Sequence, residues 1–238
     1  MTVGPVALAW SGGKDSALAL AALRRDGTEV AALLTTFTDD YDRVSMHGVR
    51  RALVRDQAAA AGIPLVEVGI PAGCVDELYA ARMEAAFRSP PLVELGAVAS
   101  GDLFLEDVRA YREERLASAG KAALFPLWGR DTAALARTFI EDGFEAYVVC
   151  VDTRRLDASF AGRDYDSSFL DDLPSGVNPC GENGEFHSFV HAAPCFERPI
   201  SCRVGEHVIR EGFAFADLVA CGGAQAVPAQ RLTVDMSG

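Results

Sequence analysis

Short apolar runs alternate with alanine- and leucine-rich amphipathic stretches along the first two thirds of the chain. The runs have the length of buried strands, and the stretches that follow them have the length of helices. Gly27 and Gly62 end two of the helical stretches, and Pro64 follows the second. Strand and helix units of this spacing predict an α/β fold with a doubly wound parallel sheet and right-handed crossovers. The predicted strands are 3–10, 29–36, 65–70, 97–100, 123–127 and 146–151, and the predicted helices are 14–26, 47–61, 75–88, 103–119 and 132–141.

The pattern changes after about residue 152. Residues 155–172 are polar and acidic, and residues 174–190 are dense in glycine, proline, asparagine and glutamate. From residue 196 to residue 218 the apolar positions alternate with a period near two, and Gly205 and Gly212 are turn candidates. We therefore predict a main domain over residues 1–151 and a smaller C-terminal α+β part over residues 152–238, which ends in antiparallel strands.

The charge balance argues against a surface that binds nucleic acid. Lysine and arginine number 22 in the 238 residues, aspartate and glutamate number 34, and the formal net charge is −12. Affinity for phosphate backbones comes from clustered cations, so a nucleic-acid partner is disfavoured, although a local basic groove stays compatible with the sum. The chain also has no apolar run of the roughly 18–20 residues that a membrane span needs, so we expect no membrane partner.

The six cysteines contain no Cys-x-x-Cys pair, which gives no support to a zinc-ribbon or thioredoxin-like site. We assign no metal ligands from the sequence. Met1 to Trp10 lack the basic start of a signal peptide, so we expect a cytoplasmic protein with reduced thiols. The cysteines are Cys74, Cys150, Cys180, Cys195, Cys202 and Cys221.

A glycine-containing segment lies between the first predicted strand and the first predicted helix. Its glycines permit positive φ and a close backbone approach, while the N–H groups and dipole at the start of a helix favour an anion. Several charge-assisted hydrogen bonds of about 1.5–3 kcal/mol each can hold a polyphosphate there. Doubly wound sheets also bind ligands at the carboxyl ends of their strands. The predicted phosphate-binding residues are Ser11, Gly12, Gly13, Lys14, Asp15 and Ser16.

This segment matches neither of two common nucleotide-binding motifs. It lacks the spacing of the Walker loop and of the dinucleotide fingerprint. Gly120-Lys121 is no Walker loop either, because Arg115 and Ala122 stand where glycine and serine should be. Ser-Gly-Gly-Lys-Asp-Ser instead resembles the PP-loop of ATP pyrophosphatases. That resemblance implies cleavage of ATP between its α and β phosphates, with Lys14 and Asp15 in the catalytic machinery.

Further motifs follow in order: VSMHG at 44–48, GDLF at 101–104, PLW at 126–128, GR at 162–163 and CGENGEFH at 180–187. Together they resemble the diphthine–ammonia ligase family, the N-type ATP pyrophosphatases of the PP-loop superfamily, over about residues 5–200. The chain looks like a bacterial relative. The resemblance implies a Rossmann-like ATP-binding domain of the adenine nucleotide alpha hydrolase type. It also implies that ATP and magnesium are used, and that AMP and pyrophosphate are released as an acyl group is amidated.

The Cys-Gly-Glu-x-Gly-Glu block is the most specific of these motifs. Glu182 and Glu185, on a turn with Gly181 and Gly184, can converge on a substrate amine, on ammonia or on magnesium. The alternative is a solvated acidic turn. His187 shares a face with Glu185 in an extended chain and can carry a proton near neutral pH, or it can be a structural hydrogen-bond partner. The resemblance favours catalytic roles for the three side chains and substrate contact for the two glycines.

Other candidates follow predicted strands. His47 stands where the family has a Met-His element, so we expect His47 and Thr35 to contact the nucleotide. Gly101 and Asp102 should face the cleft and contact substrate, and the alternative for Asp102 is a helix cap. Arg112 matches an arginine of the family, and a surface ion pair is an equal alternative for it.

Three further side chains favour structural interpretations. Phe125 and Trp128 can stack on adenine, but aromatic residues at a strand end more often belong to the core. Cys180 has no basic sequence neighbour that would lower its pKa, so a structural role is favoured over a nucleophilic one.

These observations predict an ATP-dependent, amide-forming ligase. It would adenylate a carboxylate on a small molecule or a protein side chain, release pyrophosphate, and then release AMP on attack by ammonia or an amine. A homodimer is compatible with the sequence. Two alternatives stay open: a PP-loop enzyme that modifies tRNA, which the missing cysteine pair weakens, and an ATP- or AMP-binding protein with little turnover.

Overall fold

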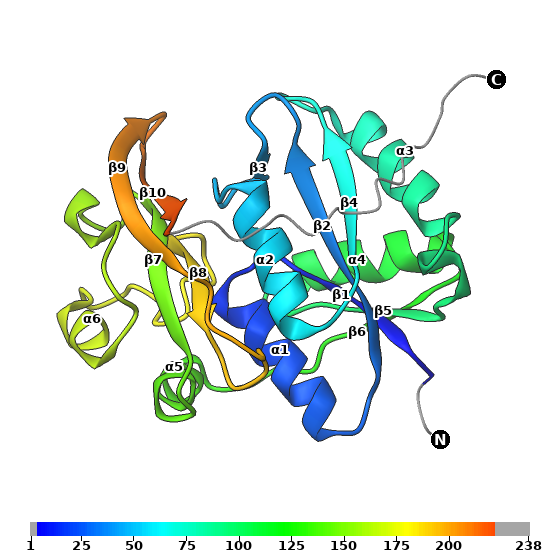
Figure 1. Ribbon diagram of the computed structural model, residues 1–238, viewed down its shortest axis with the longest axis horizontal. Coiled ribbons are helices and arrows are strands. Elements are labelled where there is room, and N and C mark those ends of the chain that lie inside the picture. The colour runs from blue at the N-terminus through cyan, green and yellow to red at the C-terminus, as the bar shows by residue number, and fades with distance from the viewer. Residues whose placement is uncertain (1–3, 222–238) are drawn as a thin grey trace.

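The first half of the chain folds into a six-stranded, mainly parallel sheet, as shown by a computed structural model that describes residues 4–221 (Figure 1). Alternating strands and helices were predicted here, and the structure confirms them. The elements are β1 (Val6–Ala9), α1 (Lys14–Arg25), β2 (Val30–Thr38), β3 (Arg43–Val44), α2 (Arg51–Ala61), β4 (Leu65–Ile70), α3 (Asp76–Phe87), the 3-10 turn η1 (Leu92–Glu94), β5 (Ala97–Ala99), α4 (Glu106–Ser118) and β6 (Ala122–Leu124).

The order of the strands creates a crevice beside β1. β2 pairs in parallel with β1 and β4, and its end pairs with the short antiparallel β3. The other edge of β1 pairs with β5, which pairs with β6, again in parallel. The direction of winding therefore switches between β1 and β5, and ligands of doubly wound sheets bind at such a switch point. The predicted doubly wound parallel sheet is confirmed.

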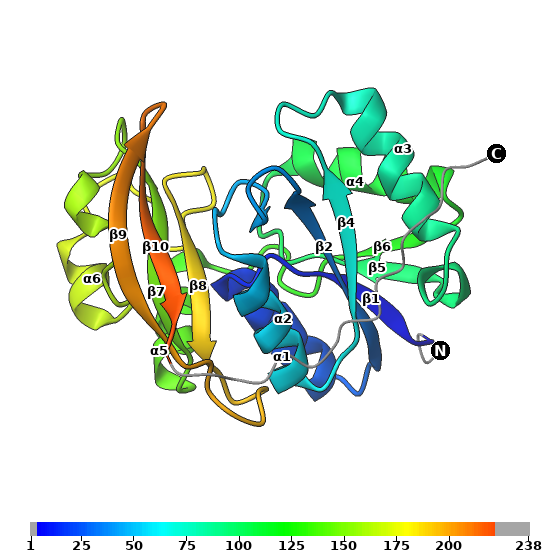
Figure 2. The same cartoon turned by 45° about the horizontal axis from the view of Figure 1, so that its top comes forward.

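Helices cover both faces of this sheet because its strands are apolar on both sides. Val6 and Leu8 of β1 are fully buried and pack in the core that includes residues of α1 and α2. Ala7, which points to the opposite face, packs in a second core with residues of α3 and α4. Figures 1 and 2 show α1 and α2 on one side of the sheet and α3 and α4 on the other.

The second half forms a four-stranded antiparallel sheet in the order β8-β7-β10-β9. The helices α1 and α2 lie between the two sheets (Figure 2), and one core cluster includes residues from both sheets. Within residues 4–221, no helix is long and apolar enough to cross a membrane. The elements are α5 (Thr132–Glu141), β7 (Glu145–Asp152), the 3-10 turn η2 (Ala158–Phe160), α6 (Ser167–Asp172), β8 (Phe186–Ala192), β9 (Cys202–Arg210) and β10 (Phe213–Ala220).

The strand predicted at 146–151 exists as β7 but does not belong to the parallel sheet. It pairs antiparallel with β8 and β10, at the centre of the second sheet. It is buried on both faces, and this gives it the continuous apolar run that is typical of a parallel strand. The domain boundary at residue 151 stays a prediction, and strand pairing favours a boundary before β7.

Other differences concern polar segments. The helix predicted at 47–61 begins only at Arg51, because residues before it form β3 and a tight turn. The helix predicted from residue 103 begins at Glu106. Strand β8 and helix α6 were not predicted. Gly212 lies in the predicted turn with φ +83°, whereas Gly205 lies inside β9.

Candidate active site

A cavity of about 380 Å³ opens at the carboxyl end of the parallel sheet. Its walls come from residues 11–16 (the phosphate turn), the end of β2, the turn before α2, the loop after β5, and residues 180–188 (the 180–188 segment). Of the predicted site residues, only Gly12 and Glu185 are outside the lining. Those that line it are Ser11, Gly13, Lys14, Asp15, Ser16, Thr35, His47, Gly101, Asp102, Arg112, Gly181, Glu182, Gly184 and His187.

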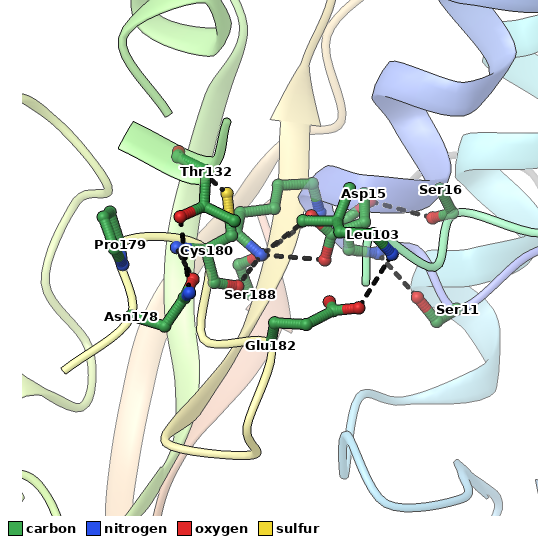
Figure 3. Close-up of polar contacts among 12 residues, drawn as sticks. Ser11, Asp15, Ser16, Leu103, Thr132, Asn178, Pro179, Cys180, Glu182 and Ser188 are labelled. Atoms are coloured by element: carbon green, nitrogen blue, oxygen red, sulfur yellow. Dashed lines mark hydrogen bonds and ion pairs between the residues drawn. The ribbon is translucent and has the colours of Figure 1, made fainter. Parts of the chain in front are cut away.

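The phosphate turn is completed by a strand far away in the sequence. Helix α1 starts after Gly13, which has no side chain to cap it. The Ser188 hydroxyl of β8 accepts a hydrogen bond from the Lys14 backbone N–H at 3.1 Å, and Ser11 Oγ accepts one from Gly13 N–H at 3.3 Å. Ser16 Oγ donates to the Gly13 carbonyl at 2.8 Å. Figure 3 shows Ser11 and Ser16 on one side of this site and Ser188 on the other.

The two glycines are needed for packing within the protein. Gly12 has φ +80°, and a Cβ there would lie 2.6 Å from Gln57 Oε1. A Cβ on Gly13 would lie 3.1 Å from the Ser188 carbonyl oxygen. The backbone at these glycines therefore approaches α2 and β8 closely, and the expected close approach to a ligand stays a prediction.

Gln57 is a structural residue of the site that the sequence interpretation missed. It is fully buried in α2. Its Oε1 accepts from Trp10 Nε1 at 3.0 Å, and its Nε2 donates to the carbonyls of Gly12 at 2.9 Å and Val190 at 2.6 Å. It thus ties together β1, the phosphate turn and β8. The available signal was a glutamine on an otherwise apolar helix face, next to Leu53 and Val54.

Lys14 connects the phosphate turn with the 180–188 segment. Its buried Nζ lies 2.8 Å from Asp15 Oδ2 and also donates to the Cys180 carbonyl. Burial is the largest single effect and would lower the pKa of Lys14, but the negative charges around it, chiefly that of the hydrogen-bonded Asp15 carboxylate, together outweigh burial, and the pKa lies above its ordinary value. Lys14 therefore holds a fixed positive charge at the start of α1, where the N–H groups already favour an anion.

Glu182 faces the same cavity from the 180–188 segment. Its Oε1 accepts a hydrogen bond from the Leu103 backbone N–H at 2.8 Å, which joins the segment to the loop after β5 (Figure 3). Burial, assisted by the charges of Asp15 and Asp102, raises the pKa of Glu182 to about 7. A carboxyl group that titrates near neutral pH can accept a proton in one state and donate it in the other.

Glu185 is placed differently from Glu182. Its buried carboxylate accepts hydrogen bonds from Asn178 N–H at 3.0 Å, from Asn183 N–H at 2.9 Å and from the Asn183 amide at 3.0 Å. Burial alone would raise the pKa of Glu185, but these hydrogen bonds outweigh burial and lower it. The predicted convergence of the two carboxylates is not what the geometry shows, because Glu185 binds its own loop outside the cavity lining.

The two predicted histidines meet in the cavity wall. The rings of His47 and His187 lie 4.3 Å apart between centroids, with 32° between their planes. Burial and the charge of Lys14 lower the pKa of His187 to about 4. His187 is therefore neutral at pH 7, and this argues against the proton carrier near neutral pH that the sequence suggested.

The loop after β5 packs closely against the phosphate turn. A Cβ on Gly101 would lie 2.7 Å from the Asp15 carbonyl oxygen. Asp102 Oδ2 lies 2.8 Å from Arg112 Nε, and both residues line the cavity, so this ion pair is not the surface pair expected as the alternative for Arg112. Thr35 Oγ1 donates to the Trp10 carbonyl at 2.6 Å, and this holds β2 against β1.

The remaining candidates have structural contacts. Cys180 Sγ donates to the Thr132 carbonyl at 3.3 Å, and burial raises the pKa of Cys180 to about 12, which agrees with a structural role. Phe125 and Trp128 are outside the cavity lining and pack under Arg109, whose guanidinium carbon lies 5.1 and 4.7 Å from the two ring centroids.

An apolar pocket of about 230 Å³ adjoins the cavity between α3 and α4. Its floor is made by Ala9, Leu34 and Val98 of the sheet, and Met83 and Phe87 contribute from α3. The sequence pattern could not predict this pocket, because its apolar residues have the same pattern as ordinary core positions. The residues it shares with the cavity lining are Ala9, Leu34, Tyr79, Met83, Ser100 and Arg112.

The carboxylates of the cavity are suited to a magnesium ion that is already bound to phosphate groups. They do not form a metal site of their own. Among residues 4–221, no group of three or more His, Cys, Asp or Glu side chains is placed to hold a metal ion. Magnesium bound to a polyphosphate keeps several waters and needs only one or two protein carboxylates. Asp15, Asp102 and Glu182 line the cavity and are close enough for the first two to raise the pKa of the third.

Comparisons with known proteins identify the family. Residues 4–120 match the model of the diphthamide synthase N-terminal domain, and residues 131–218 match that of its C-terminal domain. A diphthine–ammonia ligase of Danio rerio is 27% identical over 230 residues, covering 87% of this chain and 89% of the relative. One of Homo sapiens is 26% identical over 234 residues, covering 89% and 87%.

A solved structure from Methanocaldococcus jannaschii, described as a predicted subunit of tRNA methyltransferase, is also similar. It has a TM-score of 0.42 and 17% identity, and the match covers 81% of this chain and 98% of that one.

Proposed function

The chain belongs to the diphthamide synthase family and is an enzyme of the ATP-dependent ligase class, and from this premise we propose that it joins a carboxylate to ammonia or an amine through an adenylate. One observation carries the proposal: the phosphate turn and the 180–188 segment, far apart in sequence, line one cavity. Lys14 contacts both the Ser188 hydroxyl and the Cys180 carbonyl there, so the phosphate turn packs directly against the segment that carries Glu182.

ATP fits this site with its phosphates on the phosphate turn and its base in the apolar pocket. The start of α1 and the charge of Lys14 favour the β and γ phosphates. The pocket between α3 and α4 has room for a purine, and burying flat apolar surface there contributes about 25 cal/mol per Å². Ser100 lines both the cavity and the apolar pocket, so one ATP molecule can occupy the two together.

The protein's part in adenylation is electrostatic. The substrate carboxylate attacks the α phosphate, the bond to the β phosphate breaks, and pyrophosphate leaves with the electron pair. Lys14 and the N–H groups of α1 stabilise the charge that develops on the leaving oxygens. Magnesium, when bound with the phosphates, would supply further positive charge, and Asp15 and Asp102 are the side chains that would hold it.

The second step needs a base. As the nitrogen forms its bond to the acyl carbon, the bond to the AMP oxygen breaks and AMP leaves with that electron pair. The surplus proton on nitrogen passes to the Glu182 carboxylate, because a group with a pKa of about 7 is partly ionised at neutral pH. His187, with a pKa of about 4, is the weaker base of the two.

Phosphorus-31 NMR of ATP turnover with a panel of carboxylates and ammonium tests the proposal. The expected products are AMP and pyrophosphate, and ADP with orthophosphate would contradict the mechanism. Lys14→Ala should remove most turnover. Lys121→Ala is the matched control, because Lys121 is also buried and donates to the carbonyls of Leu92 and Leu95 away from the cavity. Tight ATP binding without pyrophosphate release from any carboxylate would favour a nucleotide-binding protein instead.

A further inference from the structure

The start of α1 has a serine hydroxyl on either side (Figure 3). Ser11 Oγ accepts a hydrogen bond from the Gly13 N–H at 3.3 Å, and Ser188 Oγ accepts one from the Lys14 N–H at 3.1 Å. A backbone N–H can only donate, so both hydroxyl oxygens are the acceptors in these contacts. Two successive N–H groups of the phosphate turn are therefore bonded to hydroxyls that stand between them and the cavity.

The Ser188 hydroxyl keeps its own O–H for another acceptor. A serine hydroxyl has one donor and two lone pairs, and the Lys14 N–H uses one lone pair of Ser188. Ser16 Oγ donates its O–H to the Gly13 carbonyl at 2.8 Å, whereas within residues 4–221 no protein acceptor is hydrogen-bonded to the O–H of Ser188. Ser188 is 3% exposed and lines the cavity, so its O–H is left for a group that enters the cavity.

The position of Ser188 is fixed by hydrogen bonds of its own strand. Two residues further along β8, the Val190 N–H donates to the Gly12 carbonyl at 2.9 Å. Gln57 Nε2 donates to the Val190 carbonyl at 2.6 Å. Strand β8 therefore runs alongside the phosphate turn at a fixed spacing. A donor that is already held in place needs little further ordering when an anion binds.

We propose that the Ser188 hydroxyl binds the departing pyrophosphate: its O–H donates to a phosphate oxygen while its oxygen accepts from the Lys14 N–H. This inference rests on the proposed function and adds a phosphate-binding residue outside residues 11–16. The hydrogen bond from the Lys14 N–H polarises the Ser188 hydroxyl and strengthens it as a donor. An ionised phosphate oxygen is a strong acceptor, because charge-assisted hydrogen bonds are about twice as strong as neutral ones.

The substrate carboxylate is the competing acceptor, and the position of Ser188 favours phosphate over it. The hydroxyl is bonded to the start of α1, where the helix dipole and the Lys14 charge favour a polyphosphate. Ser11 offers a second hydroxyl of the same kind on the other side of the turn. A diphosphate has oxygens enough to accept from both hydroxyls together.

Calorimetry with inorganic pyrophosphate and magnesium tests the inference, because pyrophosphate has neither a carboxylate nor a nucleoside. Ser188→Ala removes the O–H, and we expect its affinity for pyrophosphate to fall at least about tenfold, the equivalent of about 1.4 kcal/mol. The affinity for AMP, which has no β or γ phosphate, should stay within about twofold of the wild type. The variant also loses the acceptor at the start of α1, so its Tm should fall by about 1–8 °C.

Asp166→Ala is the matched control for this loss of a helix cap. The Asp166 side chain accepts from the Phe169 N–H at 2.8 Å at the start of α6, outside the cavity lining. Asp166→Ala should therefore lower Tm and leave the affinity for pyrophosphate unchanged.

Three results would overturn the inference: no binding of pyrophosphate to the wild type, an unchanged affinity in Ser188→Ala, or an equal loss of affinity for pyrophosphate and AMP. The last result would mean that Ser188 only shapes the turn. A crystal structure with magnesium and pyrophosphate is an independent check, in which Ser188 Oγ should lie about 2.5–3.0 Å from a phosphate oxygen. A phosphate bonded directly to the Lys14 N–H, with the Ser188 hydroxyl displaced, would contradict the inference. The proposed function fails separately, if the wild type releases no pyrophosphate from ATP with any carboxylate.

Discussion

Replacing Gly101 by alanine tests the contact on which the shape of the phosphate turn depends. An added Cβ would lie 2.7 Å from the carbonyl oxygen and 2.8 Å from the carbonyl carbon of Asp15. Both are backbone atoms in the first turn of α1, so no flexible side chain can yield. Either the loop after β5 or the start of α1 must move. Overpacking of this kind costs about 1–3 kcal/mol.

The matched control is Gly96→Ala, at the other end of β5. No atom lies within 4 Å of a Cβ at Gly96, and neither glycine has a positive φ. A compatible Gly→Ala change stabilises by about 0.4–1 kcal/mol, because it restricts the unfolded chain. For a protein of this size, 1 kcal/mol corresponds to about 2–4 °C in Tm. The two effects together amount to about 1.4–4 kcal/mol, so we expect Gly101→Ala to melt about 3–16 °C below Gly96→Ala.

The effect on the ligand should accompany the effect on stability. Moving the start of α1 weakens the N–H groups that face the phosphates, and a loss of about 1.4 kcal/mol is a tenfold loss of affinity. Calorimetry with ATP and magnesium, together with thermal melts of both variants, measures the two quantities. If Gly101→Ala matches Gly96→Ala in both Tm and ATP affinity, the loop after β5 does not shape the phosphate turn and the reasoning is refuted.

Four further predictions concern single side chains. The activity of the wild type should rise with pH around pH 7. This rise should be absent in Glu182→Gln. Since the pKa of Glu182 in the folded protein (about 7) lies above its ordinary value, its stabilising contribution is lost as pH rises from about 4.5 to 7, and melts of Glu182→Gln should lack this decline. Asp217→Asn should lower stability by about 1–2 kcal/mol in urea melts, because Arg43 and Arg50 pair with it at 2.8 and 2.5 Å; an unchanged midpoint would contradict this. Cys180 should resist iodoacetamide at pH 8 until the protein unfolds, and labelling of the native protein, seen by mass spectrometry, would refute the buried thiol. Glu185→Gln should lower Tm and leave ATP affinity intact, whereas loss of affinity at unchanged Tm would give it a direct role.

The elements with strong local signals were predictable. The strand at 65–70 and the helix at 132–141 have the predicted bounds, since apolar runs and glycine or aspartate stops mark their ends. The strand at 146–151 was found but assigned to the wrong sheet. Burial on both faces gives the same apolar run in a central antiparallel strand as in a parallel one, so its pairing depends on β8 and β10 and not on its own sequence.

The candidate site, too, has parts that the sequence predicted and parts that it could not predict. The strand–turn–helix geometry of residues 11–16 was predictable because it is local, and phosphate binding there stays a prediction. Ser188, which caps α1, stands 174 residues from Lys14, and nothing in its sequence neighbourhood indicates that contact. The separate roles of Glu182 and Glu185 also escaped prediction, because only the folded loop shows which carboxylate its own N–H groups occupy.

A crystal structure of the protein with α,β-methylene-ATP and magnesium would bear most directly on the central claim, because this analogue cannot be cleaved between its α and β phosphates. We expect the β and γ phosphates over residues 11–16 within reach of Lys14, and the base between α3 and α4. A nucleotide bound elsewhere, with residues 11–16 holding no phosphate, would contradict it.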